Sequence, residues 1–197
     1  MSAEERVVPG AYRRFLLSWL DAPFAVGAVA PSGRRLARLL TRDIRAGDLV
    51  VELGPGTGTV TREILNRGVR QQDLHLVERC RGFADLLRLR FPNADVVCGD
   101  AAAGHPSLDA CRGKVDSVIS GLPLVLFSRE QKSRLLDQVF GLLGADGAFY
   151  QFTYGGRCPV DRRQLAAHGL EARCIGFIAR NMPPAFVYRI ARRPVTG

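Results

Sequence analysis

The sequence is poor in lysine and has no long apolar run. Lys114 and Lys132 are the only lysines among 28 basic residues, so arginine carries almost all of the net charge of +9 on this chain of 197 residues. An excess of arginine favours an anionic partner, with phosphate as the element common to nucleic acids and lipid headgroups. No stretch approaches the roughly 18 uninterrupted apolar residues that cross a bilayer, so we expect a protein that is soluble or lies on a membrane surface.

Cysteine and histidine are also sparse. The five cysteines form no C-x-x-C pair, and an odd number leaves one over in any disulfide scheme. We therefore expect reduced thiols in a cytoplasmic protein. The three histidines stand singly, so no cluster has metal-ligand spacing and no metal is predicted.

Asp21 and Pro23 interrupt the apolar stretch near the N-terminus, and no secretory signal is expected there.

Strand-like and helix-like segments alternate from Asp48 onward. Apolar runs at 49–53, 74–78, 94–100, 115–120 and 147–154 predict strands, and the segments 59–66, 82–91, 129–143 and 162–167 predict helices. Near-continuous apolar strands alternating with helices indicate a mostly parallel sheet with helices on both faces. The last two runs, 170–180 and 184–193, have no helix between them and predict a C-terminal antiparallel hairpin.

This α/β layout resembles that of the Rossmann-like methyltransferases. The length and the 47% hydrophobic content favour a single domain over residues 1–197. Within it, we expect an N-terminal helical extension over 1–45 that binds membrane or substrate, and a Rossmann-like core over 46–197.

A glycine cluster follows the first predicted strand. VVELGPGTG places Gly54, Gly56 and Gly58 where backbone can approach a ligand and the next helix supplies free amides. The dinucleotide fingerprint G-x-G-x-x-G/A fails in both registers because threonine stands at its last position, and no Gly-Lys-Ser/Thr follows to make a phosphate-binding loop. The E-x-G-x-G-x-G pattern that remains is that of S-adenosylmethionine binding, with Glu52 placed to meet the methionine ammonium group. A plain tight turn is the alternative.

Acidic residues stand at the ends of the next two strands. Glu78 lies where a carboxylate accepts both ribose hydroxyls of a nucleoside, unless it is a solvated partner of a neighbouring arginine. Asp100 is expected to accept the adenine amino hydrogen while the Ala101 amide contacts the ring, and a helix N-cap is the alternative role for Asp100.

The fourth strand ends in Ser120-Gly121-Leu122-Pro123 followed by leucine, with no acid, base or nucleophile of high reactivity. The segment resembles the Asn/Asp/Ser-x-Pro-aromatic loop of amino-methyltransferases. That resemblance implies that the loop holds an amine through oxygen atoms and aims its lone pair at the sulfonium methyl group. Alignment alone reaches effective molarities of ~10⁵ M or more, so no catalytic base is required. Leucine in place of the aromatic residue favours a slim, apolar-tailed amine over a flat nucleobase; a plain core loop is the alternative.

Three further residues are candidates for contact with substrate. Tyr154 ends the fifth predicted strand, where its hydroxyl would reach the amine or a phosphate. Arg157 and Arg180 are candidate phosphate ligands because a guanidinium fork matches phosphate oxygens. Each could instead be a capping or surface residue.

The N-terminal extension carries two basic segments. A helix over 10–22 would place Tyr12, Phe15 and Trp19 on one stripe with Arg13 and Arg14 off it, which suits an anionic lipid interface; packing over the cofactor pocket is the alternative. A second helix opens at 31–33, and each basic side chain near an anionic leaflet contributes ~1 kcal/mol. A solvated face or an RNA contact is the alternative for these arginines, which are Arg34, Arg38, Arg42 and Arg45.

The motifs VGAVAPSGRRLARLL, VELGPGTGTVT, LHLVE, SGLPL, FYQFTYGGRCPV and RNMPPAFVYRI together resemble the bacterial soluble-type phospholipid N-methyltransferases. The resemblance implies stepwise methylation of phosphatidylethanolamine toward phosphatidylcholine, with S-adenosylhomocysteine as the second product. It also implies a peripheral enzyme on the cytoplasmic face of the inner membrane, with a phospholipid substrate, no nucleic acid and no obligate protein partner.

Two other functions remain open. Ribosomal RNA adenine dimethylases share the E-x-G-P-G-x-G-x-x-T opening, but they carry Asn-Leu-Pro-Tyr at the loop and continue into a helical RNA-binding domain. A non-catalytic adaptor that binds S-adenosylmethionine would keep the cofactor residues without methyl turnover.

Overall fold

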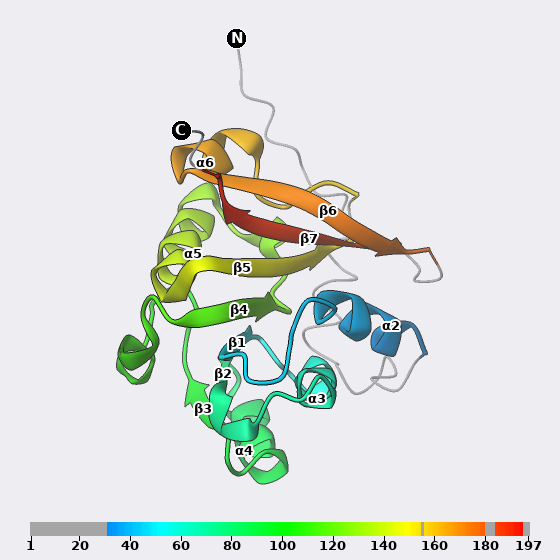
Figure 1. Cartoon of the computed structure of the whole chain (residues 1–197), viewed down its shortest axis with the longest axis vertical. Coiled ribbons are helices and arrows are strands. Elements are labelled where there is room, and N and C mark those ends of the chain that lie inside the picture. The colour runs from blue at the N-terminus through cyan, green and yellow to red at the C-terminus, as the bar shows by residue number, and fades with distance from the viewer. Residues whose placement is uncertain (1–30, 155, 180–183, 195–197) are drawn as a thin grey trace.

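The computed structural model describes residues 31–154, 156–179 and 184–194, and the fold is built on one seven-stranded sheet (Figure 1). The spatial order of the strands is β3-β2-β1-β4-β5-β7-β6. The first five strands are parallel to one another, and β7 runs antiparallel to both β5 and β6. The strands are β1 (Val50–Leu53), β2 (Leu74–Glu78), β3 (Asp95–Cys98), β4 (Val115–Ser120), β5 (Leu143–Thr153), β6 (Leu170–Ile178) and β7 (Ala185–Arg192).

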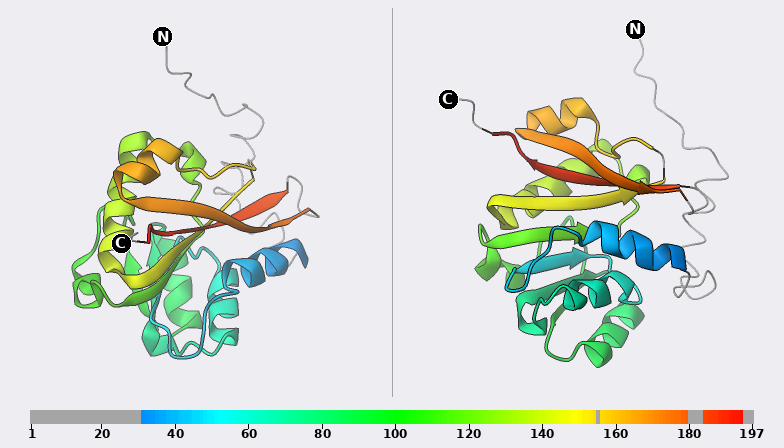
Figure 2. Two further views of the ribbon diagram at one scale, coloured as in Figure 1. Left: turned by 45° about the horizontal axis from the view of Figure 1, so that its top comes forward. Right: turned by 45° about the vertical axis from the view of Figure 1, so that its right-hand side comes forward.

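Helices cover both faces of the sheet, as Figures 1 and 2 show. On one face α2 (Pro31–Leu40), α3 (Thr59–Asn66) and α4 (Arg81–Arg90) bury apolar side chains in a shared core. On the other face the core is shared by α5 (Arg129–Leu142), α6 (Arg162–Ala167) and the 3-10 helix η2 (Pro106–Cys111). Two short 3-10 helices, η1 (Gln71–Asp73) and η3 (Leu124–Leu126), complete the elements. The predicted parallel sheet with a C-terminal hairpin and helices on both faces is confirmed.

Sequence periodicity explains how the two cores form. In β1, Val51 and Leu53 point into the core that α5 covers, while Val50 points into the core that α2 covers, because successive strand residues face opposite sides.

Ser128 begins α5 with a capping box. Its hydroxyl accepts from the backbone N–H of Gln131, and the Gln131 side chain accepts from the backbone N–H of Ser128.

Some element bounds differ from the sequence-based prediction. Strand β5 begins at Leu143, four residues before the predicted start, and its pairing with β4 shifts register between Val115 and Ser117. Helix α2 ends at Leu40, so Arg42 and Arg45 lie in turns beyond it instead of continuing the arginine spacing of the helix. Ile44, between these two arginines, is buried, so the chain turns back toward the core there.

Within the described residues, no helix is long and apolar enough to cross a membrane. The predicted helix over 10–22 lies outside them.

Candidate functional site

The predicted cofactor residues lie along one edge of the sheet, where the parallel strands end, and those on β1 and β2 come together there. Sheet order reverses between β1 and β4, and such a reversal leaves a crevice at the carboxyl ends of the strands. Leu53, the last residue of β1, pairs with Val77 of β2 and with Ser120 of β4. The structure therefore brings the glycine loop after β1, the end of β2 and the 120–123 loop side by side.

The glycine loop has a backbone that other residues rarely adopt. Gly54, Gly56 and Gly58 have φ angles of 69°, 55° and 82°, all in the left-handed region. The N–H of Gly54 donates to the Val77 carbonyl at 2.9 Å, and Arg90 donates to the Thr57 carbonyl at 2.6 Å. These bonds fix the loop in front of the N-terminus of α3.

Glu78 fastens the glycine loop to the end of β2. Its carboxylate accepts from the backbone N–H of Gly56 at 3.0 Å and from that of Cys80 at 2.8 Å, and the residue is 7% exposed. A carboxylate oxygen has two lone pairs, so each oxygen still has capacity for a ribose hydroxyl. The alternative of a solvated carboxylate is wrong for this buried position, and the ribose contact stays a prediction that the geometry fits.

Glu52 is a buried acid on the α3 side of the sheet. It is 2% exposed, and its carboxyl accepts a hydrogen bond from the Thr61 hydroxyl at 2.6 Å. The pKa of the Glu52 carboxyl is raised from 4.5 to about 8, mainly by burial and in smaller part by the nearby charge of Glu78, while hydrogen bonds from Thr61 oppose the shift. A bound ammonium group would favour the ionised carboxylate, which is consistent with the predicted role beside the methionine amine.

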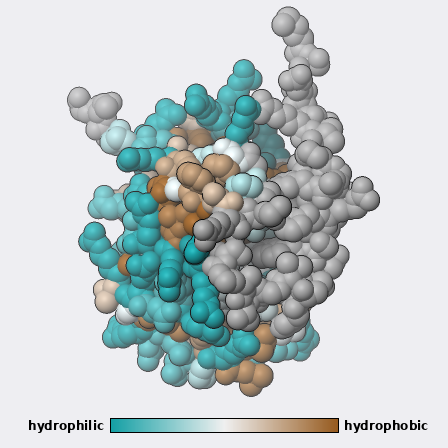
Figure 3. Space-filling model, turned by 90° about the vertical axis from the view of Figure 1, so that its right-hand side faces the viewer, coloured by the Kyte–Doolittle hydropathy of each residue, from teal (hydrophilic) through white to brown (hydrophobic). Residues whose placement is uncertain are grey.

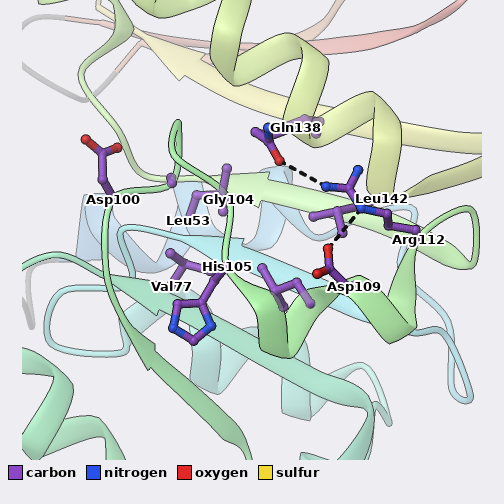
Figure 4. A pocket seen from close by; sticks show the side chains of 12 residues that line it. Leu53, Val77, Asp100, Gly104, His105, Asp109, Arg112, Gln138 and Leu142 are labelled. Carbon is purple, nitrogen blue, oxygen red and sulfur yellow. Dashed lines mark hydrogen bonds and ion pairs between the residues drawn. The ribbon is translucent and has the colours of Figure 1, made fainter.

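Asp100 and Ala101 lie in a turn after β3. Asp100 is exposed, and its carboxylate accepts from the backbone N–H of Ala102 at 2.9 Å. It therefore caps a turn, and no helix begins there. Both residues line one end of a pocket whose other end holds the ion pair of Arg112 with Asp109 (Figure 4). The remaining walls of that pocket are mainly apolar, and neither the glycine loop nor the 120–123 loop lines it.

The 120–123 loop packs backbone to backbone on the glycine loop. Ser120 is fully buried, and its hydroxyl accepts from the backbone N–H of Leu122 at 3.2 Å. Gly121 donates its N–H to the Leu53 carbonyl at 2.8 Å, and a Cβ atom on Gly121 would lie 2.6 Å from the Gly54 carbonyl oxygen. Pro123 directly precedes η3.

Gln151 of β5 contributes to this loop, and the sequence analysis assigned it no role. Its side-chain amide donates to the Leu122 carbonyl at 2.9 Å, from the strand next to β4. A polar residue inside the apolar run FYQFT was the available signal.

Two of the remaining predicted contacts, Tyr154 and Arg157, follow β5 at the same edge of the sheet. Tyr154 directly follows β5, and its ring meets that of Phe152 edge-on at 5.4 Å. Arg157 is exposed and belongs to no ion pair within the described residues. The other predicted contacts lie outside the residues that the structure describes; they are Arg180, Tyr12, Arg13, Arg14, Phe15 and Trp19.

In the described part of the chain, no three Asp, Glu, His or Cys side chains are grouped in a way that would hold a metal ion.

Comparison with known proteins agrees with this geometry. The sequence model of a family described as "Methyltransferase domain" matches residues 50–147. The ornithine lipid N-methyltransferase of Singulisphaera acidiphila is 35% identical over 181 residues, which cover 88% of this chain and 92% of the relative. The ribosomal RNA small subunit methyltransferase A of Phenylobacterium zucineum is 35% identical over 91 residues, which cover 46% of this chain and 30% of that protein.

A solved structure supports the fold. The 1,6-didemethyltoxoflavin-N1-methyltransferase of Burkholderia thailandensis, crystallised with 1,6-didemethyltoxoflavin and S-adenosylhomocysteine, superimposes with a TM-score of 0.65 at 15% identity, over 98% of this chain and 93% of that one. The strand order, the left-handed glycine loop and the buried acidic residues Glu52 and Glu78 complete the evidence. The chain therefore belongs to the class I S-adenosylmethionine-dependent methyltransferases, and S-adenosylmethionine is its cofactor.

Proposed function

We propose that the protein methylates the primary amine of a membrane lipid, with phosphatidylethanolamine as the first acceptor and phosphatidylcholine as the end of the series. The observation that carries the proposal is the 120–123 loop, which sets hydroxyl and carbonyl oxygens directly beside the glycine loop. The lipid amine named for the Singulisphaera relative supports the same substrate class, and ornithine lipid is accordingly a second acceptor to test.

The chemistry needs alignment more than acid or base groups. The sulfonium methyl group of the cofactor has a neutral thioether as its leaving group, so a neutral amine that is held in line attacks it without further activation. Oxygen atoms around the loop orient the amine through its N–H groups, and water takes the proton that the amine loses.

The Cys158 thiol, which follows β5, is a poor candidate for a nucleophile. Burial raises its pKa to about 11, so it stays protonated near neutral pH.

An aromatic pair with one exposed and one half-buried ring lies close to the same edge and supports a lipid substrate. In β7, Phe186 pairs with Thr153 at the end of β5, and its ring stacks on that of Phe177 with centroids 5.7 Å apart. Phe177 is 61% exposed, and Figure 3 shows an apolar area among hydrophilic residues on the side toward which the hairpin points. An apolar surface together with the exposed guanidinium of Arg157 suits a lipid whose phosphate lies between amine and acyl chains.

We place the enzyme on the cytoplasmic face of the inner membrane, bound peripherally. Arg34 and Arg38 are exposed on α2 while Leu36 and Leu40 of the same helix are buried. This arrangement leaves basic side chains available to an anionic leaflet without disturbing the core.

The test incubates purified protein and radiolabelled S-adenosylmethionine in three parallel reactions. Two contain anionic vesicles with either phosphatidylethanolamine or ornithine lipid, and the third contains unmodified small-subunit ribosomal RNA. Label in either lipid, absent with Glu78→Ala, supports the proposal and identifies the headgroup. Label in RNA alone would overturn it in favour of a nucleobase acceptor, and no label in any reaction would favour the non-catalytic adaptor.

A further inference from the structure

Gln151 combines complete burial with an unpaired oxygen. It is 0% exposed, and its Nε2 donates to the carbonyls of Leu122 at 2.9 Å and Phe152 at 2.7 Å. Two carbonyl acceptors identify the nitrogen end of the amide, because an oxygen in that place would face two other oxygens. The opposite end, Oε1, is buried and has no hydrogen-bond partner among the described residues.

The unpaired oxygen lies next to the acceptor loop. Gln151 pairs with Ser120 across β4 and β5, so both side chains project from the same face of the sheet at its carboxyl edge. The loop that receives the Nε2 bond is only partly buried at residues 121–123. A buried carbonyl oxygen without a partner is unfavourable, and an arriving N–H donor would relieve that state.

The loop itself offers few acceptors for an amine. Gly121 cannot carry a side chain, because its Cβ would lie 2.6 Å from the Gly54 carbonyl oxygen. A neutral primary amine that directs its lone pair at a methyl group has two N–H groups to satisfy. The Ser120 hydroxyl already accepts one backbone bond, and the Leu122 carbonyl already accepts the Gln151 amide.

We propose that Oε1 of Gln151 accepts a hydrogen bond from the substrate amine and, with Leu122 held by the other end of the same amide, aims its lone pair. This inference rests on the proposed lipid-amine function. In the step, the nitrogen lone pair forms the N–C bond as the S–C bond breaks with its electrons left on sulfur, and the ammonium product gives its proton to water. Gln151 orients the amine throughout and exchanges no proton.

The test compares an acceptor that has N–H groups with a ligand that has none. Gln151→Met removes the acceptor at nearly constant volume. With vesicles of the primary-amine lipid that the wild type methylates, we expect kcat/KM to fall about tenfold to a hundredfold. The trimethylated form of the same lipid has no N–H group, and we expect its inhibition constant as a competitor to stay within about threefold. If the wild type also methylates the dimethylated lipid, we expect Gln151→Met to lower the methylation rate of that lipid less than the rate of the primary-amine lipid.

Gln164→Met is the matched control. Gln164 is also buried and also donates its amide to a backbone carbonyl, that of Arg129 at 2.7 Å, but it lies on α6 away from the loop. We expect Gln164→Met to lower thermal stability but to leave kcat/KM for the primary-amine lipid unchanged relative to the inhibition constant of the trimethylated lipid. If Gln151→Met weakened the inhibition by the trimethylated lipid as much as it lowered kcat/KM for the primary-amine lipid, the role of Gln151 would be purely structural and the inference would be overturned. A loss of kcat/KM alone in Gln164→Met would overturn it as well.

Gln151→Glu provides a second readout through pH. A buried, protonated carboxyl keeps one donor and one acceptor, so we expect this variant to retain activity at low pH and to lose it relative to wild type as pH rises. If the activity of Gln151→Glu relative to wild type did not change with pH, the proposed role of the Gln151 amide as donor and acceptor would be contradicted. If the wild type labels no lipid amine at all, the proposed function fails before Gln151 is tested.

Discussion

Gly121 and Gly54 are in contact through their backbones, so the loop that holds the acceptor and the loop that holds the cofactor form one unit. An alanine Cβ at position 121 would lie 2.6 Å from the Gly54 carbonyl oxygen. We expect Gly121→Ala to push the loops apart, destabilise the protein by about 1–3 kcal/mol and reduce methyl transfer about tenfold or more. Denaturant unfolding and single-turnover kinetics measure the two effects.

Gly82→Ala is the control for this change. Gly82 lies in α4, has no positive φ, and a Cβ there would meet no atom within 4 Å. We expect that variant to be as stable as the wild type or more so, because alanine favours a helix. Full activity in Gly121→Ala would mean that the two loops move independently.

Glu52 makes stability depend on pH. Its folded-state pKa of about 8 lies above the ordinary value of 4.5, so the folded protein keeps a proton that the unfolded chain releases. The resulting stabilisation is fully present below about pH 4.5 and is lost as pH rises through about 8, at up to about 1.4 kcal/mol per pH unit between them. Glu52→Gln should flatten this dependence in urea unfolding between about pH 5 and about pH 8.

The same carboxyl should report on cofactor binding. A methionine ammonium group beside Glu52 lowers its pKa, so binding of S-adenosylhomocysteine near neutral pH should release up to about one proton. Calorimetry in buffers of different ionisation enthalpy measures that release, and Glu52→Gln should abolish it. Unchanged proton release in the variant would place the ammonium elsewhere.

Much of this fold follows from local sequence pattern. The strands Leu74–Glu78 and Val115–Ser120 and the helices Thr59–Asn66 and Arg162–Ala167 have the predicted bounds, since turn or capping residues close each apolar run. The start of β5 was missed because Gly144 and Asp146, which precede the predicted strand, are residues that favour turns. There, pairing with β4 across a register shift overrides local preference.

The site was predictable as a set of positions and not as a set of contacts. Glycine and acidic residues at strand ends pointed to the cofactor, because sheet topology brings strand ends together. The contact between Gly121 and Gly54 and the bond from the Gln151 side-chain amide to the Leu122 carbonyl join residues that are far apart in sequence. A polar residue inside an apolar run marks Gln151 as unusual, but only the folded arrangement shows that its side chain contacts the acceptor loop.

Glu78 should be sensitive even to an isosteric change. Glu78→Gln can accept from only one of the two backbone amides that the carboxylate now holds, those of Gly56 and Cys80, and it turns an NH₂ group toward the other. We expect affinity for S-adenosylhomocysteine to fall about tenfold to a hundredfold, measured by calorimetry. Glu63→Gln on α3, which loses only long ion pairs of 3.9–4.0 Å to Arg38 and Arg67, should bind normally.

Phe177 tests the membrane contact with little risk to the fold, because it is 61% exposed. Inserting a phenyl ring into a lipid interface contributes up to about 1.5–3 kcal/mol, so Phe177→Ala should weaken binding to anionic vesicles about tenfold or more. Sedimentation with vesicles measures the effect, and thermal unfolding should shift only slightly, because the change removes the stack on Phe186 from an exposed position. Leu89→Ala is the matched control, since Leu89 is 82% exposed but lies on α4. Equal losses of vesicle binding in both variants would indicate nonspecific hydrophobic adsorption. A loss confined to Phe177→Ala would assign membrane contact to the hairpin beside the acceptor loop.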